Sequence, residues 1–381
     1  MSDFLFIDIE TRSKVDLKKS SIVHYSNDSS TEIICISYCI LSKKDINFKN
    51  KPKIKTIFFP KKFKDLPLEI QKFKGKIVNF NFSFEYEVLN NVFKDSNSHF
   101  NNTDNYLDTM RILNRFGFTG KLEEIGEFFN RFLPSHSLKL EVGKKLINKF
   151  SKPNKDNDFN EIDKQSLKDF GEYCEQDVYL TINIFKIFYP IYLLEEKEEI
   201  ELDRIDRKVN SNGIKIDLQS LGVLEKSINF FDNYFFNEAS KFGVVNKKVL
   251  VISSNAEFLN LVNSFSKKLK FSPLENSQEE TLKELSYYLE SLKDSKDKTK
   301  LLEILDLRNF INSKSLKKIN AFSSLNYKGR IYYNLRYHYA RTGRFSSSGV
   351  QIQNLSRNAI DSKEYENKID DLKKKISIWV L

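Results

Sequence analysis

The stretch Phe-Leu-Phe-Ile-Asp-Ile-Glu-Thr at residues 4–11 predicts a short apolar β-strand close to the N-terminus. A strand directs alternate side chains to the same face, so Asp8 and Glu10 share one face while Ile7 and Ile9 point to the other. Two carboxylates about 4 Å apart repel each other by about 4 kcal/mol at an effective dielectric of about 20. If the pair is buried it needs a compensating cation, and hard oxygen ligands favour Mg²⁺ or Mn²⁺. The alternative is an acidic strand end in solvent, so the interpretation depends on whether the chain supplies further ligands.

The size and composition of the chain are those of a basic globular protein. Its 381 residues are enough for two or three domains, and 33 Phe and 17 Tyr supply bulky core material. The formal net charge of +10 and the isoelectric point of about 9.1 suit a polyanionic partner such as DNA. Lys, Asn, Ile, Phe and Ser are frequent throughout, as in AT-rich coding sequences, so part of this charge reflects base composition.

Several classes of protein are disfavoured by the same composition. Three cysteines do not make a disulfide framework in a chain of this length, and none of the four histidines lies near a cysteine with zinc-ligand spacing. No run approaches the ~18 apolar residues of a membrane span. The N-terminus passes directly into the first strand without a basic and apolar leader. We therefore expect a cytoplasmic protein with no membrane contact.

A central sheet and a first helix are expected next. Residues 32–41, 55–59 and 76–81 are β-rich and fit one sheet with the first strand. A helix begins near Phe84, which places Glu85 in its first turn. From there the Glu85 carboxylate can reach a metal held by the first strand, although an acid in a first turn more often only complements the helix dipole.

A later helix carries the next candidates. It is preceded by a strand end, two amphipathic helices and a polar loop, expected at residues 106–110, 122–129, 138–150 and 151–160. The long helical region begins near residue 161, and the i, i+4 spacing places Tyr173 and Asp177 on one face. Asp177 would be a metal ligand, and the Tyr173 hydroxyl would hydrogen-bond the water that attacks a phosphodiester. An ordinary half-buried tyrosine is the alternative.

Taken together, these motifs resemble a known family. D-x-E on the first strand, N-x-x-F-E at a strand-to-helix turn and Y-x-x-x-D on a late helix occur in the order found in the DnaQ-like, RNase H-fold 3′–5′ exonucleases of the subtype with a tyrosine. The resemblance implies that Asp8, Glu10, Glu85 and Asp177 hold two Mg²⁺ or Mn²⁺ ions and that Tyr173 positions the water. The middle motif of the family usually ends in Asp, so Glu85 is a departure, one methylene longer but still an oxygen ligand.

The middle of the chain is expected to be mostly helical. The helix pattern at residues 201–210 ends at an Asn-Gly stop signal and is followed by a strand-like segment at 214–217. Residues 218–325 are rich in Lys, Glu and Ser, and two helices within 281–320 are separated by a charged run at 293–300. We interpret that run as a solvated face and assign it no chemistry.

An acid-free segment follows. Neither Asp nor Glu occurs between Asn326 and Ile360, whereas arginines gather there, at positions 330, 336, 341, 344 and 357. The planar fork of arginine suits bidentate phosphate contacts. We expect an aromatic strand at 331–339, a turn at 342–344, and then serines and amides that can approach a DNA backbone and read minor-groove acceptors. A basic surface hairpin without a ligand is the alternative.

This segment also resembles a family. Residues 341–355, R-T-G-R-F-S-S-S-G-V-Q-I-Q-N-L, look like the R-T-G-R segment of family A DNA polymerases, and residues 210–217 look like the segment that opens their polymerase region. With the exonuclease motifs in front, the layout is similar to polymerase I-type enzymes of bacteriophages. The resemblance implies contacts with primer–template DNA by Arg341, Thr342, Arg344, Ser346, Ser347, Gln353 and Asn354.

The resemblance implies an α/β fold in three parts. Residues 1–190 would be a DnaQ-like exonuclease domain with an RNase H-like mixed sheet. Residues 191–325 would be a helical connector and thumb-like region, and residues 326–381 the beginning of the palm. In the family, the palm carboxylates and the fingers helix follow later, but here only residues 357–381 remain, with a predicted helix at 363–376 and an apolar Ile-Trp-Val-Leu end.

The expected function is therefore that of the N-terminal part of a replicative DNA polymerase, either one half of a split enzyme or a truncated product. This chain would carry 3′–5′ proofreading on single-stranded 3′ ends, inside a bacterium or a phage-infected host. Nucleotidyl transfer would depend on a second polypeptide with the fingers and palm motifs. A free-standing metal-dependent exonuclease and a non-catalytic DNA-binding remnant are the alternatives.

Overall fold

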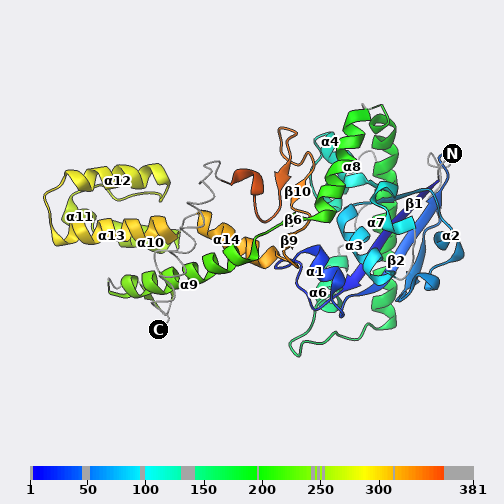
Figure 1. The fold of residues 1–381 in the computed structure, drawn as a ribbon, viewed down its shortest axis with the longest axis horizontal. Coiled ribbons are helices and arrows are strands. Elements are labelled where there is room, and N and C mark those ends of the chain that lie inside the picture. Colours follow the sequence, from blue (N-terminus) through cyan, green and yellow to red (C-terminus); the bar gives the residue numbers. More distant parts are fainter. Residues whose placement is uncertain are drawn as a thin grey trace. The chain divides into compact units, whose positions relative to one another are not determined.

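The computed structural model describes residues 3–44, 52–94, 99–129, 142–194, 197–241, 245–246, 249–250, 254–311 and 314–355. The described residues form two compact units, drawn as ribbons in Figure 1. The first unit contains the described residues up to 216 together with those of 324–355, and the second contains those of 217–323. The C-terminal acid-free segment thus belongs to the same unit as the first strand.

A five-stranded mixed sheet lies at the centre of the first unit, in the order β3-β2-β1-β4-β5. β1 pairs antiparallel with β2, and β2 with β3, whereas β4 runs parallel to β1 and β5 parallel to β4. The strands are β1 (Phe4–Arg12), β2 (Glu32–Leu41), β3 (Lys55–Phe58), β4 (Lys76–Asn79) and β5 (Tyr106–Asp108). The expectations of an α/β fold and of a sheet built on the first strand are therefore confirmed.

Helices cover both faces of this sheet (Figure 1). They include α1 (Ile22–Asn27), α2 (Leu68–Gln71), α3 (Phe82–Val92), α4 (Thr109–Arg115), α5 (Leu122–Phe129), α6 (Val142–Phe150), α7 (Lys164–Tyr192) and α8 (Lys197–Asn212). The long helix α7 begins at its cap Asp163, which accepts a hydrogen bond from the Ser166 backbone N–H at 2.8 Å. It continues through Pro190 and ends at Tyr192.

The alternation of β1 distributes its side chains between two cores. Leu5 and Ile7 are buried with side chains of α2 and α3, whereas Phe4 and Phe6 are buried with side chains of α4, α5 and α7. Even-numbered residues of a strand share a face, so Asp8 lies on the side of the sheet that α7 covers. The register of β1 thus sets which helix the acidic residues meet.

Residues 326–355, which we call the hairpin segment, are fastened to the first unit through short strands. β9 (Arg330–Ile331) pairs antiparallel with β6 (Ile214–Lys215), and β10 (Leu335–Arg336) pairs antiparallel with β11 (Ser346–Ser347). On α8, the side-chain amide of Asn210 accepts from the Leu335 N–H at 3.0 Å and donates to the Leu335 carbonyl at 3.1 Å. The buried Asn210 side chain therefore fixes the hairpin segment to α8.

The continuous strand expected at 331–339 is not formed. Tyr333 and His338 have left-handed backbones, with φ of 50° and 47°, so only the short strands β9 and β10 pair. The physical reason is tertiary: the Tyr333 hydroxyl reaches Glu87 on α3, and the Tyr337 hydroxyl reaches Glu199 on α8, and these contacts override β propensity. The turn expected at 342–344 is present, because the Gly343 N–H donates to the Ala340 carbonyl at 2.8 Å.

The second unit is mostly helical, as expected, and its core is rich in leucine. Its elements are α9 (Leu218–Lys241), β7 (Val245–Asn246), β8 (Val249–Leu250), α10 (Asn255–Asn263), α11 (Ser266–Leu269), α12 (Glu279–Ser291), α13 (Lys296–Ile311) and most of α14 (Lys314–Leu325). The charged run at 293–300, interpreted from the sequence as a solvated face, is only partly so, because Lys298 is buried. Lys298 lies in α13, and its ammonium donates to the Leu292 carbonyl, at the end of α12, at 2.7 Å.

Some expectations lie outside the described residues. These are the predicted helix at 363–376, the rest of residues 356–381, and residues 138–141 of the helix expected at 138–150, whose remainder is α6. Among the helices that the structure describes, none combines the length and the hydropathy that a membrane span requires.

The contact between Glu87 and the hairpin segment predicts a pH-dependent stability. Glu87 is 8% exposed and accepts a hydrogen bond from Tyr333, and burial raises its pKa from 4.5 to about 7. The stabilising contribution of the neutral acid is complete below pH 4.5 and is lost as the pH rises through about 7. At pH 8 we expect Glu87→Gln, which stays neutral, to raise the free energy of unfolding by up to about 3 kcal/mol.

The measurement is urea unfolding of native and Glu87→Gln chains at pH 5 and pH 8. At pH 5 the two chains should agree closely, because Glu87 is then largely protonated. Equal differences at the two pH values would contradict the assignment of this pH dependence to Glu87.

Candidate active site

Three carboxylates come together where β1 meets α7. One ligand oxygen from each of Asp8, Glu10 and Asp177 lies within 4.8 Å of the others. β1 supplies the first two through its period of two, and α7, which packs against β1, supplies Asp177. Three negative charges this close repel one another strongly, so the cluster favours either protonation or a bound cation.

Glu85 is the fourth acid of this group. It lies in the first turn of α3, is 3% exposed, and borders the same cavity as Asp8 and Asp177. The Asn79 side-chain amide, at the end of β4, donates to its carboxylate at 3.4 Å. Burial, and then the neighbouring Asp8 carboxylate, raise the pKa of Glu85 well above its ordinary value. A cation nearby would reverse this effect and allow Glu85 to ionise.

This donor set fits a hard divalent cation. All four side chains offer carboxylate oxygens, the ligands that Mg²⁺ and Mn²⁺ prefer, and among the described residues of the cluster there is no histidine or thiolate to favour zinc. The residues that the sequence predicted as ligands, Asp8, Glu10, Glu85 and Asp177, are thus brought to one place by the fold.

Cys174 is a neighbour of this cluster that the sequence motifs did not indicate. Its thiol donates to Asp8 Oδ2 at 3.2 Å and to the Asp8 carbonyl at 3.3 Å. Burial raises the pKa of the Cys174 thiol well above its ordinary value, and its contacts make it a donor that orients Asp8.

Tyr173 is placed differently from the acids. It is 3% exposed, and in the described structure it does not line the cavity that Asp8, Glu85 and Asp177 border. Its ring lies against Gly143 on α6, where an added Cβ would come within 1.9 Å of a ring carbon. Gly143 is therefore required for the present position of the Tyr173 ring.

A cavity of about 610 Å³ extends from the acidic cluster to the hairpin segment. The acids that line it are Asp8, Glu85, Asp108 and Asp177, and the cations are Arg111, Lys121, Arg207 and Arg336. Aromatic side chains contribute as well, among them Phe80, Phe82, Phe84, Tyr333, Tyr337 and Tyr339. The cavity thus offers candidate metal ligands together with cationic and aromatic groups.

Asp108 organises the backbone around the cavity. Its buried carboxylate accepts from the N–H groups of Asn81 and Phe82, at the start of α3, and of Met110, at the start of α4, each at 3.0 Å. Burial raises the pKa of Asp108, and Arg111 acts in the opposite direction. An Asp directly before a helix is an N-cap signal, which could have identified this residue from the sequence.

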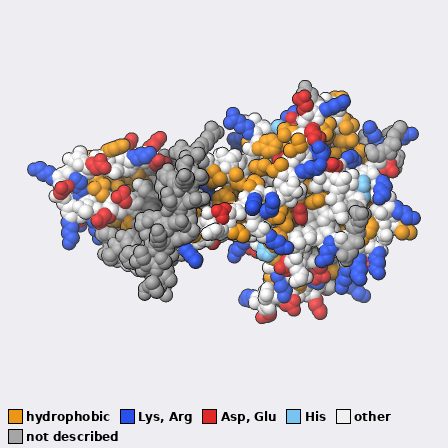
Figure 2. Space-filling view, viewed as in Figure 1, with side chains coloured by type: hydrophobic (Ala, Val, Ile, Leu, Met, Phe, Trp, Pro, Cys, Tyr) orange, Lys and Arg blue, Asp and Glu red, His pale blue; other side chains and the backbone are white. Residues whose placement is uncertain are grey.

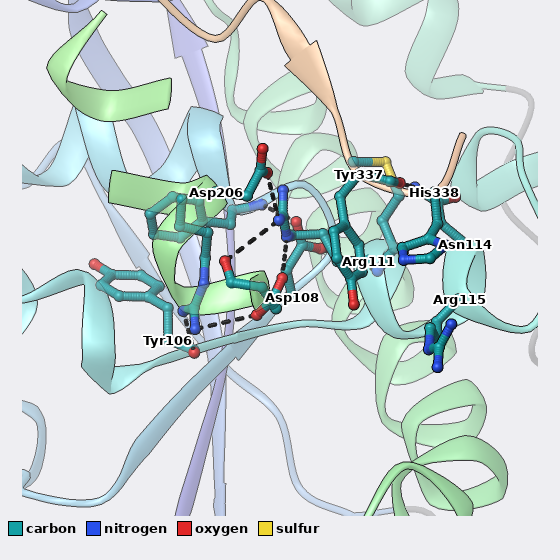
Figure 3. A network of polar contacts seen from close by, with 12 residues as sticks. Tyr106, Asp108, Arg111, Asn114, Arg115, Asp206, Tyr337 and His338 are labelled. Atoms are coloured by element: carbon teal, nitrogen blue, oxygen red, sulfur yellow. Dashed lines mark hydrogen bonds and ion pairs between the residues drawn. The ribbon is translucent and has the colours of Figure 1, made fainter. Parts of the chain in front are cut away.

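A buried ion network ties α4 to α8 beside the cavity (Figure 3). Arg111 donates to Asp203 and, at 2.5 Å, to Asp206, and its guanidinium lies 4.6 Å from the centre of the Tyr337 ring. Arg207 donates to the Tyr106 carbonyl at 2.6 Å and pairs with Asp203 at 3.1 Å. Both arginines are therefore neutralised by acids of α8 and serve to hold the wall in place.

The residues predicted to contact DNA lie on the exposed part of the hairpin segment. Five of them are exposed, Arg341, Thr342, Arg344, Gln353 and Asn354, and Ser346 and Ser347 are half-buried in β11. On the face shown in Figure 2, lysine and arginine side chains are spread around the first unit and do not form one patch. On this face the charge distribution alone does not mark a DNA track.

The fold is similar to that of a known DNA polymerase. The polymerase domain of Pol1 from M. smegmatis, solved in complex with DNA primer-template and dNTP, matches with a TM-score of 0.51 and 12% sequence identity. The match covers 94% of this chain and 53% of that chain, so this chain spans about half the length of the solved one. No protein-family model and no curated protein matches the sequence. The chain thus has a DNA polymerase-like fold.

The acidic cluster predicts a metal-binding phenotype. Asp177→Asn removes one charged ligand and should weaken Mn²⁺ binding at least about tenfold, because affinity depends on the number of charged ligands. The measurement is isothermal titration calorimetry. Glu172→Gln, at an exposed position on the same helix, is the matched control and should keep the native affinity. Equal Mn²⁺ affinity in native and Asp177→Asn chains would count against the site.

Proposed function

We propose that this chain carries a two-metal 3′–5′ exonuclease centre within the N-terminal part of a family A DNA polymerase of bacteriophage type. The observation that carries the proposal is the meeting of Asp8, Glu10 and Asp177 within 4.8 Å, with Glu85 beside them. These four acids are the ones that the DnaQ-like motifs single out. The mixed sheet and the DNA polymerase-like fold support the same assignment.

The proposed reaction is hydrolysis of the last phosphodiester of a DNA 3′ end. Asp8, Glu10, Glu85 and Asp177 would hold two Mg²⁺ or Mn²⁺ ions, which when bound would neutralise the phosphate and activate water. Cys174 holds the Asp8 carboxylate through its S–H donor. The Tyr173 hydroxyl is proposed to hydrogen-bond the attacking water, which requires it to reach the cavity from the buried place of its ring against Gly143. Water attacks phosphorus, the bond to the 3′ oxygen breaks, and a nucleoside 5′-monophosphate leaves.

A second role is proposed for the hairpin segment. Residues 326–355 contain one Lys and four Arg and no acid, and Arg341, Arg344, Gln353 and Asn354 are exposed. Arginine forks and side-chain amides suit contacts with phosphates and minor-groove acceptors. We infer that this surface binds primer–template duplex in the cytoplasm of a bacterium or a phage-infected host.

DNA synthesis is a further candidate, because the similar solved chain is a polymerase domain with primer-template and dNTP. We infer that synthesis would require fingers and palm residues in addition to those of residues 1–381. Primer extension with the chain alone and with a candidate partner tests this inference. Extension only in the mixture supports it, and extension by this chain alone contradicts it.

The nuclease assignment predicts the effect of removing a ligand. Asp8→Asn should lower release of 3′ nucleotides from a single-stranded oligonucleotide by at least about 10³-fold, since metal catalysis contributes several kcal/mol. Time courses in Mg²⁺ and in Mn²⁺ measure the rate, and Glu172→Gln should retain it. A native chain that releases no nucleotides, or an unchanged rate in Asp8→Asn, would refute the assignment.

The packing of Tyr173 predicts a distinct phenotype for Gly143→Ala. The new Cβ would displace the Tyr173 ring, so the nuclease rate should fall about tenfold or more while Mn²⁺ affinity stays native. The nuclease rate of Tyr173→Phe should fall by a similar factor if the hydroxyl hydrogen-bonds the attacking water. Gly222→Ala is the matched control, because nothing lies within 4 Å of a Cβ added there. Native rates in both Gly143→Ala and Tyr173→Phe would exclude this role of Tyr173.

A further inference from the structure

The hairpin segment builds part of the wall of the acidic cavity. Leu335, Arg336, Tyr337 and Tyr339 line the same cavity as Asp8 and Asp177, and all belong to the first unit. The segment that resembles a duplex-binding motif therefore also borders the space in which the proposed nuclease chemistry takes place.

Buried contacts fix the wall in place. The Tyr337 hydroxyl donates to Glu199 at 2.5 Å, and the Asn334 amide donates to the carbonyls of Ser348 and Val350 at 2.7 Å each. With the Asn210 and Glu87 contacts described above, the backbone on both sides of Arg336 is held. A side chain presented from such a frame is pre-organised for binding.

The cationic side chains of the cavity are of two kinds, those paired with buried acids and those exposed at the wall. Arg111 and Arg207 are paired with buried acids of α8. Lys121 and Arg336 are exposed at the cavity wall. The guanidinium of Arg336 lies 4.8 Å from the centre of the Tyr339 ring and donates to Ser348 Oγ at 3.2 Å. A guanidinium has five N–H donors, so this single hydrogen bond leaves capacity for a phosphate.

We propose that Arg336 and Tyr339 form a binding subsite for the last unpaired nucleotides of a DNA 3′ end. Single-stranded nucleic acids bind where aromatic rings stack on bases and cations meet phosphates. Tyr339 provides a half-buried ring at the wall and Arg336 provides the cation next to it. The subsite would hold an unpaired end in line with the acidic cluster. The proposal rests on the nuclease function proposed above, although the binding it describes can be measured separately.

The test is equilibrium binding of a 5′-fluorescent oligothymidylate to the full chain, followed by anisotropy in EDTA and low salt. Arg336→Ala and Tyr339→Ala should each raise the Kd about tenfold, and Tyr339→Phe, which keeps the ring, should stay within about twofold of native. Arg204→Ala on α8 and Tyr287→Ala on α12 are matched controls, because neither residue lines the cavity. Binding of a blunt duplex, which has no unpaired end, should weaken by a clearly smaller factor than binding of oligothymidylate in the same subsite variants.

Two results would overturn the subsite. One is a native Kd for oligothymidylate in both alanine variants; the other is an equal loss in Tyr339→Phe and Tyr339→Ala. Circular dichroism of each variant excludes unfolding as the cause of lost binding. Because EDTA removes the metals, a chain that shows the expected binding pattern but releases no nucleotides in Mg²⁺ or Mn²⁺ refutes the nuclease proposal and leaves the subsite supported.

Discussion

The repulsion among the acids of β1, α3 and α7 is the constraint on which the first unit depends. Asp8, Glu10 and Asp177 lie within 4.8 Å of one another, and Glu85 is buried beside them. This arrangement is electrostatically unfavourable by itself, because each ionised carboxylate makes ionisation of the others more costly. Neighbouring side chains donate hydrogen bonds to these carboxylates: Cys174 donates to Asp8, and Asn79 donates to Glu85. We interpret this arrangement as a site for a cation that the acids would bind together.

The same unit holds the hairpin segment against the acidic cavity. α8 is central to this, because its Asp203 and Asp206 fix Arg111 of α4 and its Arg207 donates to the Tyr106 carbonyl of β5. Its Asn210 and Glu199 fix the backbone and Tyr337 of the hairpin segment. Breaking one partner of a buried pair typically costs about 3–5 kcal/mol. α8 therefore couples the position of the cavity wall to the position of the acids.

The sequence predicted the regular parts well, because β1, β2 and α7 follow from apolar periodicity and caps that are local. The sequence also predicted that Asp8, Glu10, Glu85 and Asp177 lie together. That prediction came from the order of the three motifs along the chain and not from the spacing within any one of them. It did not predict the break at Tyr333 and His338, since their left-handed backbones follow from contacts with residues more than 100 positions away. Cys174 and the Arg111 network were missed for the same reason, as neither leaves a local pattern.

The most direct test of the central claim is anomalous X-ray scattering at the manganese edge, from crystals of the chain soaked with Mn²⁺ and thymidine 5′-monophosphate. The account predicts two anomalous peaks bounded by Asp8, Glu10, Glu85 and Asp177, with the phosphate of the nucleotide next to them. Density for the nucleotide or for manganese only at other places, with no peak among these four acids, would contradict it.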